Sequence, residues 1–196
     1  MNEFQKKIVL TGGHAGAVAL AIVQEIQSQG LNWKLFWLGP KQALEGKKSL
    51  TLEARVLPKL GVTFYPMKTG RLQIRWSRWT IPSAIKIPYG FLEAYIYLRK
   101  IKPNIIVSLG GYAAFPVVVI ARLLGVPVVV NEQTASVGRA NKFSSFFANK
   151  ISLARAESKP FFPKDKTVVV GLPIQAKIYK VKVKDTLSNP LQIQEI

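Results

Sequence analysis

The feature that most constrains the fold is a regular alternation of short apolar runs with longer segments of helical period. The run Ile8–Leu10, which is followed by Gly12 and Gly13, is typical of a buried strand that ends in a turn. The segments between such runs repeat apolar residues every three or four positions and stop at glycines such as Gly30 and Gly61, which favours helices. Apolar strands that alternate with helices predict an α/β fold, a Rossmann-like doubly wound parallel sheet.

One predicted helix contains residues that usually break helices. The stretch 83–103 has helical period, but Pro88 and Gly90 lie inside it. Proline removes a backbone N–H donor and clashes with the preceding turn. We therefore expect this helix to kink or divide.

Length and composition fit one folded domain. The chain has 196 residues, of which 48% are hydrophobic, and this excludes a disordered protein. It has no cysteine, which excludes a disulfide framework and a thiolate metal site. The sequence predicts neither a signal peptide nor a transmembrane helix. The strand and helix pattern decays after Pro173, so we expect a domain at residues 1–174 and a linker or tail at 175–196.

The chain is strongly basic, with a formal charge of +18 from 28 Lys and Arg against 10 Asp and Glu. The cations concentrate in two stretches, 67–102 and 139–184, and Glu93 is the one acidic residue in the first. Nucleic acid and anionic membrane surfaces both attract such patches, and charge alone does not choose between them. A solvated basic surface is the third interpretation.

Three loops fall at the predicted carboxyl edge of the sheet, where doubly wound sheets bind their ligands. They are TGGHAG at 11–16, GGYAAFP at 110–116 and NEQTASVG at 131–138. Paired glycines allow a sharp turn and bring backbone N–H groups close to a ligand, beside a helix N-terminus that favours anions. Together the loops predict a polar cleft.

His14 and Glu132 are the two candidate acid–base groups in these loops. An imidazole titrates near neutrality and can act as a general base, but His14 can also simply form hydrogen bonds within its loop. Glu132 can accept a hydrogen bond from a sugar hydroxyl, orient His14 or act as a base itself. It can equally cap a helix or pair with a cation.

In order and spacing, these loops resemble the MurG glycosyltransferases. Three motifs of that family, G-G-T-G-G-H, G-G-Y-x-x-x-P and H-E-Q-N-x-x-x-G-x-x-N-K, have counterparts here, and so do its L-E-A-R and G-x-P stretches. The matching segments are Thr11–His14, Gly110–Pro116, Asn131–Lys142, Leu52–Arg55 and Gly171–Pro173. The match covers the N-terminal half of a two-domain architecture of the GT-B type.

The resemblance implies an inverting transfer of N-acetylglucosamine from UDP-GlcNAc to undecaprenyl-pyrophosphoryl-MurNAc-pentapeptide, the conversion of lipid I to lipid II in peptidoglycan synthesis. The N-terminal domain of the family holds the lipid-linked acceptor, and the C-terminal domain holds most of the donor. No metal or cofactor is implied, since UDP-GlcNAc is a substrate. The expected location is peripheral, on the cytoplasmic face of the cell membrane. A donor domain, missing here or supplied by a separate chain, is an expected partner.

The resemblance also implies roles for individual residues. The catalytic candidates are His14, the leading candidate for the base, and Glu132. The residues expected around the acceptor and its diphosphate are Thr11, Gly12, Gly13, Gly110, Gly111, Tyr112, Gln133, Thr134 and Asn141.

Several positions depart from the family pattern. Val9 and Leu10 replace the first two glycines of the opening motif, and Asn131 replaces the histidine before Glu132. Thr134 and Leu172 each replace an asparagine, and Gln175 replaces an arginine, so its positive charge is lost. These changes favour an alternative function, a non-catalytic module that binds lipid-linked sugar or membrane.

A basic, aromatic segment in the middle of the chain is the candidate membrane surface. Arginines beside tryptophans suit the headgroup region of an anionic bilayer. The residues are Arg71, Arg75, Trp76, Arg78, Trp79, Ile81 and Ile85. Alternatively, the tryptophans pack inside the domain or against a second domain. Stacking of single-stranded nucleic acid is disfavoured, because no nucleic-acid-binding motif accompanies them.

Overall fold

A computed structural model describes residues 5–42, 49–68 and 80–175, with side chains left out for residues 80–86. The strands of this part are β1 (Lys7–Thr11), β2 (Lys34–Gly39), β3 (Thr63–Pro66), β4 (Ile105–Ser108), β5 (Val128–Glu132), β6 (Lys150–Leu153) and β7 (Thr167–Val169). The α-helices are α1 (Gly16–Ser28), α2 (Leu52–Val56), α3 (Thr80–Ile101), α4 (Ala114–Leu123) and α5 (Arg139–Ser145). Short 3₁₀ helices are η1 (Leu57–Leu60), η2 (Ala156–Phe161) and η3 (Lys164–Lys166).

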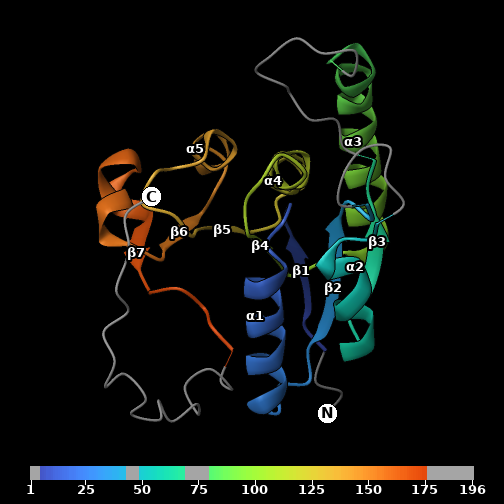
Figure 1. Cartoon of the computed structure of the whole chain (residues 1–196), viewed down its shortest axis with the longest axis horizontal. Helices are drawn as coiled ribbons and strands as arrows, with labels where there is room; N and C mark the ends of the chain where they lie inside the picture. The colour runs from blue at the N-terminus through green and yellow to red at the C-terminus, as the bar shows by residue number, and fades with distance from the viewer. Residues whose placement is uncertain (1–4, 43–48, 69–79, 176–196) are drawn as a thin grey trace, which may run out of the picture.

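The described strands form one parallel sheet of seven, in the order β3-β2-β1-β4-β5-β6-β7. This confirms the predicted α/β class and the parallel, doubly wound sheet. The chain builds outward from β1 to β3 and then crosses to β4, on the other side of β1 (Figure 1). The loops after β1 and β4 therefore lead to opposite faces, which opens a crevice at the carboxyl edge between them.

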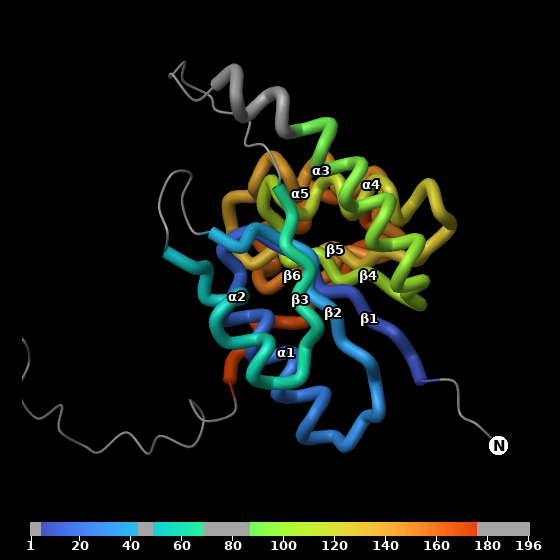
Figure 2. Tube along the Cα trace, turned by 90° about the vertical axis from the view of Figure 1, so that its right-hand side faces the viewer, coloured from blue at the N-terminus to red at the C-terminus, as the bar shows by residue number. Residues whose placement is uncertain are grey.

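Successive side chains of a strand point to opposite faces of the sheet, and in the central strands both sets are apolar. Helices therefore cover both faces of the sheet. Ile8 and Leu10 pack with Val18 and Val23 of α1, whereas Val9 packs with residues of α3 and α4. Figure 2 shows α3, α4 and α5 on one side of the sheet and α1 and α2 on the other. The loops at the carboxyl edge thus rest on a rigid support with a hydrophobic core on each face.

Helix α3 runs without interruption from Thr80 to Ile101, with Pro88 inside it. Of the two outcomes expected for this helix, a kink or a division, the division does not occur. Pro88 is exposed, so its ring does not disturb the packing of the core. Ala94 and Leu98 are buried against the sheet and hold the helix in place.

Two other elements differ from the simple pattern. The segment that begins as α2 tightens into η1 at Leu57 and ends at Gly61, whose φ of 77° is left-handed. Helix α5 is short and gives way after Ser145 to the turn that leads into β6. The structure leaves the proposed tail undescribed from residue 176 onward, so the division at 174 stays a prediction.

The candidate membrane surface lies mostly outside the described residues. Arg71, Arg75, Trp76, Arg78 and Trp79 are not described, and Ile81 and Ile85 belong to α3 without described side chains. Of the helices that the structure describes, none combines the length and apolar character needed to cross a bilayer.

Candidate functional site

The first glycine loop leaves β1 at Thr11 and enters α1 at Gly16. The buried Thr11 hydroxyl donates to the Leu38 carbonyl (2.8 Å), which fixes the end of β1 against β2. Gly12 is packed against the Trp37 ring, since a Cβ there would lie 3.3 Å from it. His14 has a φ of 62°, a left-handed conformation that is strained for a residue other than glycine, and its side chain is exposed. The loop therefore holds its imidazole out toward solvent.

The second glycine loop, after β4, packs directly on the first. The Gly13 N–H donates to the Gly110 carbonyl (3.0 Å). Gly110 and Gly111 have φ values of 85° and 88°, which only glycine adopts readily. A Cβ on Gly111 would lie 3.0 Å from the backbone N and O of Gly13. The two backbone segments can approach this closely only because residue 111 has no Cβ.

The third loop, after β5, is organised by the Glu132 carboxylate, which is 3% exposed. Its Oε1 accepts from the Thr134 backbone N–H (2.9 Å) and lies 2.7 Å from the Thr134 hydroxyl. Its Oε2 accepts from Asn141 Nδ2 (2.9 Å) and from the Gly138 N–H (3.3 Å). The carboxylate thus ties together both ends of the loop 134–138 and the first turn of α5.

A glutamine links the third loop to the second. Gln133 Nε2 donates to the Leu109 carbonyl (3.1 Å). The Leu109 N–H in turn donates to the Thr11 carbonyl (2.8 Å), at the start of the first loop. Together with the bond between Gly13 and Gly110, this joins the three loops into one unit. The sequence prediction that they gather at one edge is confirmed by these contacts.

The loops after β4 and β5 border an open hollow of about 360 Å³. Its lining consists of Leu109, Gly110, Gly111, Glu132, Gln133, Thr134, Ser136, Gly138, Arg139, Ala140 and Asn141. Asn141 lies directly beneath Gly110, where a Cβ would be 2.7 Å from its amide atoms. Among the described residues, Arg139 is the one cationic side chain of the lining, and it is exposed.

Two buried amide oxygens at this edge lack a hydrogen-bond partner, Asn131 Oδ1 and Asn141 Oδ1. Each amide is oriented through its nitrogen, because Asn131 Nδ2 donates to Ser152 Oγ (3.0 Å) and Asn141 Nδ2 donates to the Glu132 carboxylate. An unsatisfied buried acceptor is costly and often marks a functional site. Asn141 Oδ1 is covered by Gly110, so this unpaired acceptor lies under the glycine loop.

The predicted site residues fall into two groups in the structure. Gly110, Gly111, Glu132, Gln133, Thr134 and Asn141 line the hollow. Thr11, Gly12, Gly13, His14 and Tyr112 lie outside its lining, on or beside the first loop. Tyr112 is placed next to Gly13, since a Cβ on Gly13 would lie 3.7 Å from its ring.

Two residues of this region were missed by the sequence reasoning. The buried Glu53 of α2 accepts a hydrogen bond from the Ala15 N–H (2.8 Å), at the start of α1. Arg139 lines the hollow. Arg139 could have been found as a cation directly after the loop glycine Gly138. The L-E-A-R stretch points to Glu53 but gives no indication of its contact, which joins residues 38 positions apart.

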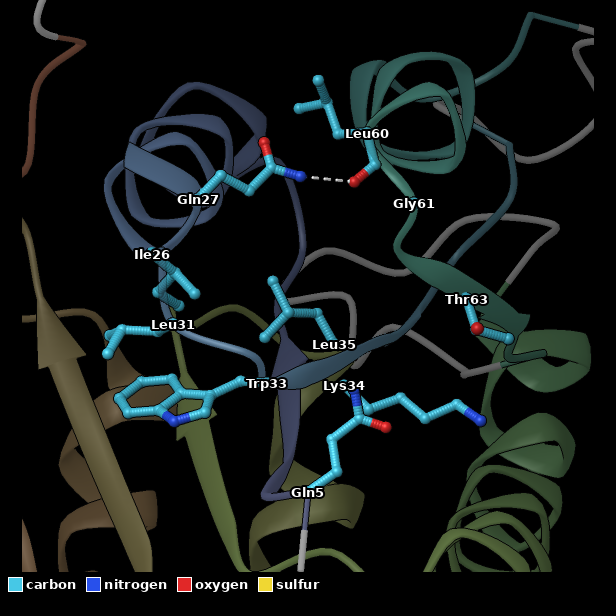
Figure 3. Close-up of a pocket in the computed structure, with 10 residues that line it drawn as sticks. All are labelled: Gln5, Ile26, Gln27, Leu31, Trp33, Lys34, Leu35, Leu60, Gly61 and Thr63. Carbon is cyan, nitrogen blue, oxygen red and sulfur yellow. Dashed lines mark hydrogen bonds between the residues drawn. The ribbon is translucent and has the colours of Figure 1, made fainter. Parts of the chain in front are cut away.

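A second hollow lies at the opposite, amino-terminal end of the sheet (Figure 3). It is lined by Gln5 and the starts of β2 and β3, together with the ends of α1 and η1. Gln27 Nε2 donates to the Leu60 carbonyl across it (2.7 Å), as the dashed line in Figure 3 marks. Neither of the unpaired amide oxygens lies here, and no predicted site residue lines it.

Residues 8–153 match the glycosyltransferase family 28 N-terminal domain. The chain belongs to this family. A relative from Bacillus cereus is 34% identical over 178 residues and is named UDP-N-acetylglucosamine--N-acetylmuramyl-(pentapeptide) pyrophosphoryl-undecaprenol N-acetylglucosamine transferase 2. A transferase of the same type from Clostridium tetani is 34% identical over 176 residues. Each alignment covers 89% of this chain, and the chain spans about half of the relatives' length (48% and 47%).

Solved structures agree with this assignment. MurG of Acinetobacter baumannii superposes with a TM-score of 0.64 at 27% identity, over 84% of this chain and 45% of that one. A UDP-GlcNAc 2-epimerase from Neisseria meningitidis superposes with a TM-score of 0.58 at 16% identity, over 86% and 47%, a likeness of fold alone. The family 28 domain described here thus matches half of a two-domain architecture.

Proposed function

We propose that this chain is the acceptor-binding half of a MurG-type N-acetylglucosaminyltransferase. It binds undecaprenyl-pyrophosphoryl-MurNAc-pentapeptide at the carboxyl edge of the sheet and presents it to UDP-GlcNAc held by a second domain. The observation that carries this proposal is the contact between the Gly13 and Gly110–Gly111 loops beside a polar hollow, in a domain whose relatives are named as this transferase.

In this proposal the acceptor diphosphate lies on the Gly110–Gly111 side of the crevice. The hollow there offers the guanidinium of Arg139, which pairs with phosphate oxygens in a bidentate manner. The Ala15 N–H at the start of α1 is already bonded to Glu53, so it is not available to an anion.

His14 is the proposed general base. It takes the proton of the acceptor hydroxyl while the hydroxyl oxygen attacks the anomeric carbon of the donor. The bond from that carbon to UDP breaks in the same step, and the configuration at the carbon is inverted. Its exposed imidazole is available for this step. Glu132 shapes the acceptor loop, because its two oxygens already serve donors from Thr134, Gly138 and Asn141.

A non-catalytic module that binds lipid-linked sugar is the second candidate. The departure at Asn131 favours it, since an amide that cannot take up a proton stands where the family pattern has a histidine. Asn131 is buried and hydrogen-bonded to Ser152, so its side chain helps to hold the end of β5 against β6.

A transfer assay tests the proposal. We expect the 196-residue chain alone to incorporate no GlcNAc into lipid acceptor, because in this proposal a second domain holds UDP-GlcNAc. Fused to the C-terminal half of the Bacillus cereus relative, it should transfer at a rate at least about a hundredfold above that of the isolated chain. Transfer by the isolated chain would contradict the proposal, and acceptor binding by an inactive fusion would favour the non-catalytic module.

The proposed location is peripheral to the cytoplasmic face of the membrane, and the described part of α3 supports it. Tyr89, Leu92 and Ile96 recur at helical spacing and are 58%, 54% and 50% exposed, and Tyr95 beside them is 45% exposed. Arg99 and Lys100 follow on the same helix and are exposed. Apolar side chains next to cations suit the boundary of an anionic bilayer.

We expect the chain to sediment with vesicles of phosphatidylglycerol and phosphatidylcholine and to be released by high salt. Changing both Leu92 and Ile96 to Glu should weaken this binding at least about tenfold, since it removes apolar area and adds negative charge. Val168→Glu, at the far edge of the sheet on β7, is the control and should bind like the wild type (Figure 1). Salt-independent partitioning, or none, would contradict membrane attachment.

A further inference from the structure

Glu53 is a buried carboxylate that the proposed chemistry has not used. It is 3% exposed, and its Oε1 accepts the Ala15 N–H at 2.8 Å, in a part of the structure closed to solvent. Ala15 is the N-cap residue of α1 and has no side-chain cap of its own. A carboxylate supplied by another helix therefore takes the role of the acidic residue of a capping box, which accepts the N-cap N–H where the positive end of the helix dipole favours a negative charge.

The sequence around Glu53 places it there by two separate contacts. Thr51 anchors α2 to the end of β2, because its hydroxyl donates to the Pro40 carbonyl (3.1 Å) and its N–H donates to the Lys41 carbonyl (3.0 Å). Gly16 lets Leu52 approach the first turn of α1, since a Cβ at Gly16 would lie 2.8 Å from the Leu52 side chain. Helix α2 is thus docked so that its one buried residue reaches the His14 loop.

The hydrogen bond to Glu53 acts on the peptide that follows His14. The Ala15 N–H belongs to the peptide plane between His14 and Ala15, so the bond fixes the ψ angle of His14. On its other side, the Gly13 N–H is fixed by the Gly110 carbonyl. His14 itself stands at a φ of 62°, a conformation that persists only when neighbouring contacts impose it.

We propose that Glu53 is a positioning residue: its contact with the Ala15 N–H holds His14 in the left-handed conformation that points the imidazole at the acceptor. The claim that the imidazole points at the acceptor rests on the proposed function. The effect of Glu53 on the conformation of His14 does not depend on it. Glu53 touches neither substrate nor the reacting atoms and acts through the backbone.

The chain offers a direct readout because His14 is its only histidine. Its imidazole therefore gives one unambiguous set of NMR signals. We expect Glu53→Ala to shift and broaden these signals and to speed amide exchange at Ala15 at least about tenfold, because a protecting bond is lost. Glu53→Gln keeps an acceptor oxygen at the same place and should leave the imidazole signals near those of the wild type.

Two further variants separate positioning from general effects. Glu25→Ala removes an exposed carboxylate from the other end of α1 and should leave the His14 signals unchanged. Gly16→Ala retains Glu53 but forces Leu52 away, so it should reproduce the His14 shift of Glu53→Ala even if that variant folds poorly.

Turnover of the fusion protein provides the second readout. Glu53→Ala should lower kcat at least about tenfold with KM within a factor of about two, since a displaced base costs rate more than binding. Glu53→Gln should restore most of kcat. If Glu53→Ala and Gly16→Ala only lower stability while the His14 signals stay as in the wild type, Glu53 is a helix cap and the inference is overturned. A fusion without any activity would count against the proposed function, whereas the NMR result would still decide the role of Glu53.

Discussion

Replacing His14 by alanine lowers the turnover of the fusion protein by about 10²–10⁴-fold, the usual contribution of a general base. The imidazole is exposed, so its loss removes little packing and should change the free energy of unfolding by less than about 0.5 kcal/mol. Acceptor affinity should also change little, because His14 lies outside the lining of the hollow. Transfer rate and acceptor affinity, measured on the same preparations, check this.

A second substitution at this position separates chemistry from backbone strain. His14→Gly relieves a φ of 62° and should be at least as stable as His14→Ala, yet equally impaired in turnover. Lys102→Ala is the matched control, since Lys102 is the other described non-glycine residue with positive φ, at 52°, and lies before the amino end of β4. Wild-type turnover in both His14 variants would remove His14 from the mechanism.

The second large effect is expected at Gly111. Gly111→Ala should lower the free energy of unfolding by about 3 kcal/mol, the sum of a left-handed alanine and a clash with backbone. The clash involves the N and O atoms of Gly13, 3.0 Å from the new Cβ, and backbone cannot move aside as a side chain can. Denaturant unfolding of the chain measures this loss.

Gly125→Ala is the control for this substitution. Gly125 has a φ of 73°, but no atom lies within 4 Å of the position that a Cβ would take. Its substitution should therefore cost only about 1–2 kcal/mol, which is the strain of the left-handed conformation alone. The difference between the two variants isolates the contact between the glycine loops. An equal loss of unfolding free energy in the two variants would mean that the contact between the glycine loops does not exclude a Cβ at residue 111.

The fold could be predicted from the sequence because its signals are local. Apolar runs and the glycines that end helices can be recognised within a window of about ten residues. The topology rules for parallel sheets then place the loops at one edge of the sheet. Helix α3 shows where this reasoning fails. Whether Pro88 divides a helix depends on which side faces water and on the packing of Ala94 and Leu98, which no local pattern contains.

The site was predictable as a set of loops but not as a set of contacts. The glycines of the first two loops could be named in advance, whereas the partners of Glu132 could not, because they depend on how the loop 134–138 folds back to α5. The contact between Glu53 and Ala15 depends on the docking of α2 against α1, which is a tertiary feature.

The structure places three of the departures from the family pattern in the strands of the sheet. Val9 and Leu10 are buried within β1 and pair with both neighbouring strands, so these substitutions fall in the sheet. The loop itself begins at Gly12, beyond them. Asn131 likewise lies within β5, one residue before its end, and its side chain bonds to Ser152 of β6. These changes alter the support of the loops and leave the glycines that contact each other in place.

The most direct test of the central claim is an NMR titration of the chain with a short-chain, water-dispersible analogue of the pyrophosphoryl-linked acceptor. We expect the largest shifts at Gly13, Gly111, Thr134 and Asn141, and Gly111→Ala should weaken binding at least about tenfold while Gly125→Ala binds normally. Shifts confined to the hollow around Trp33 and Thr63 at the other end of the sheet, or no binding at all, would contradict the account.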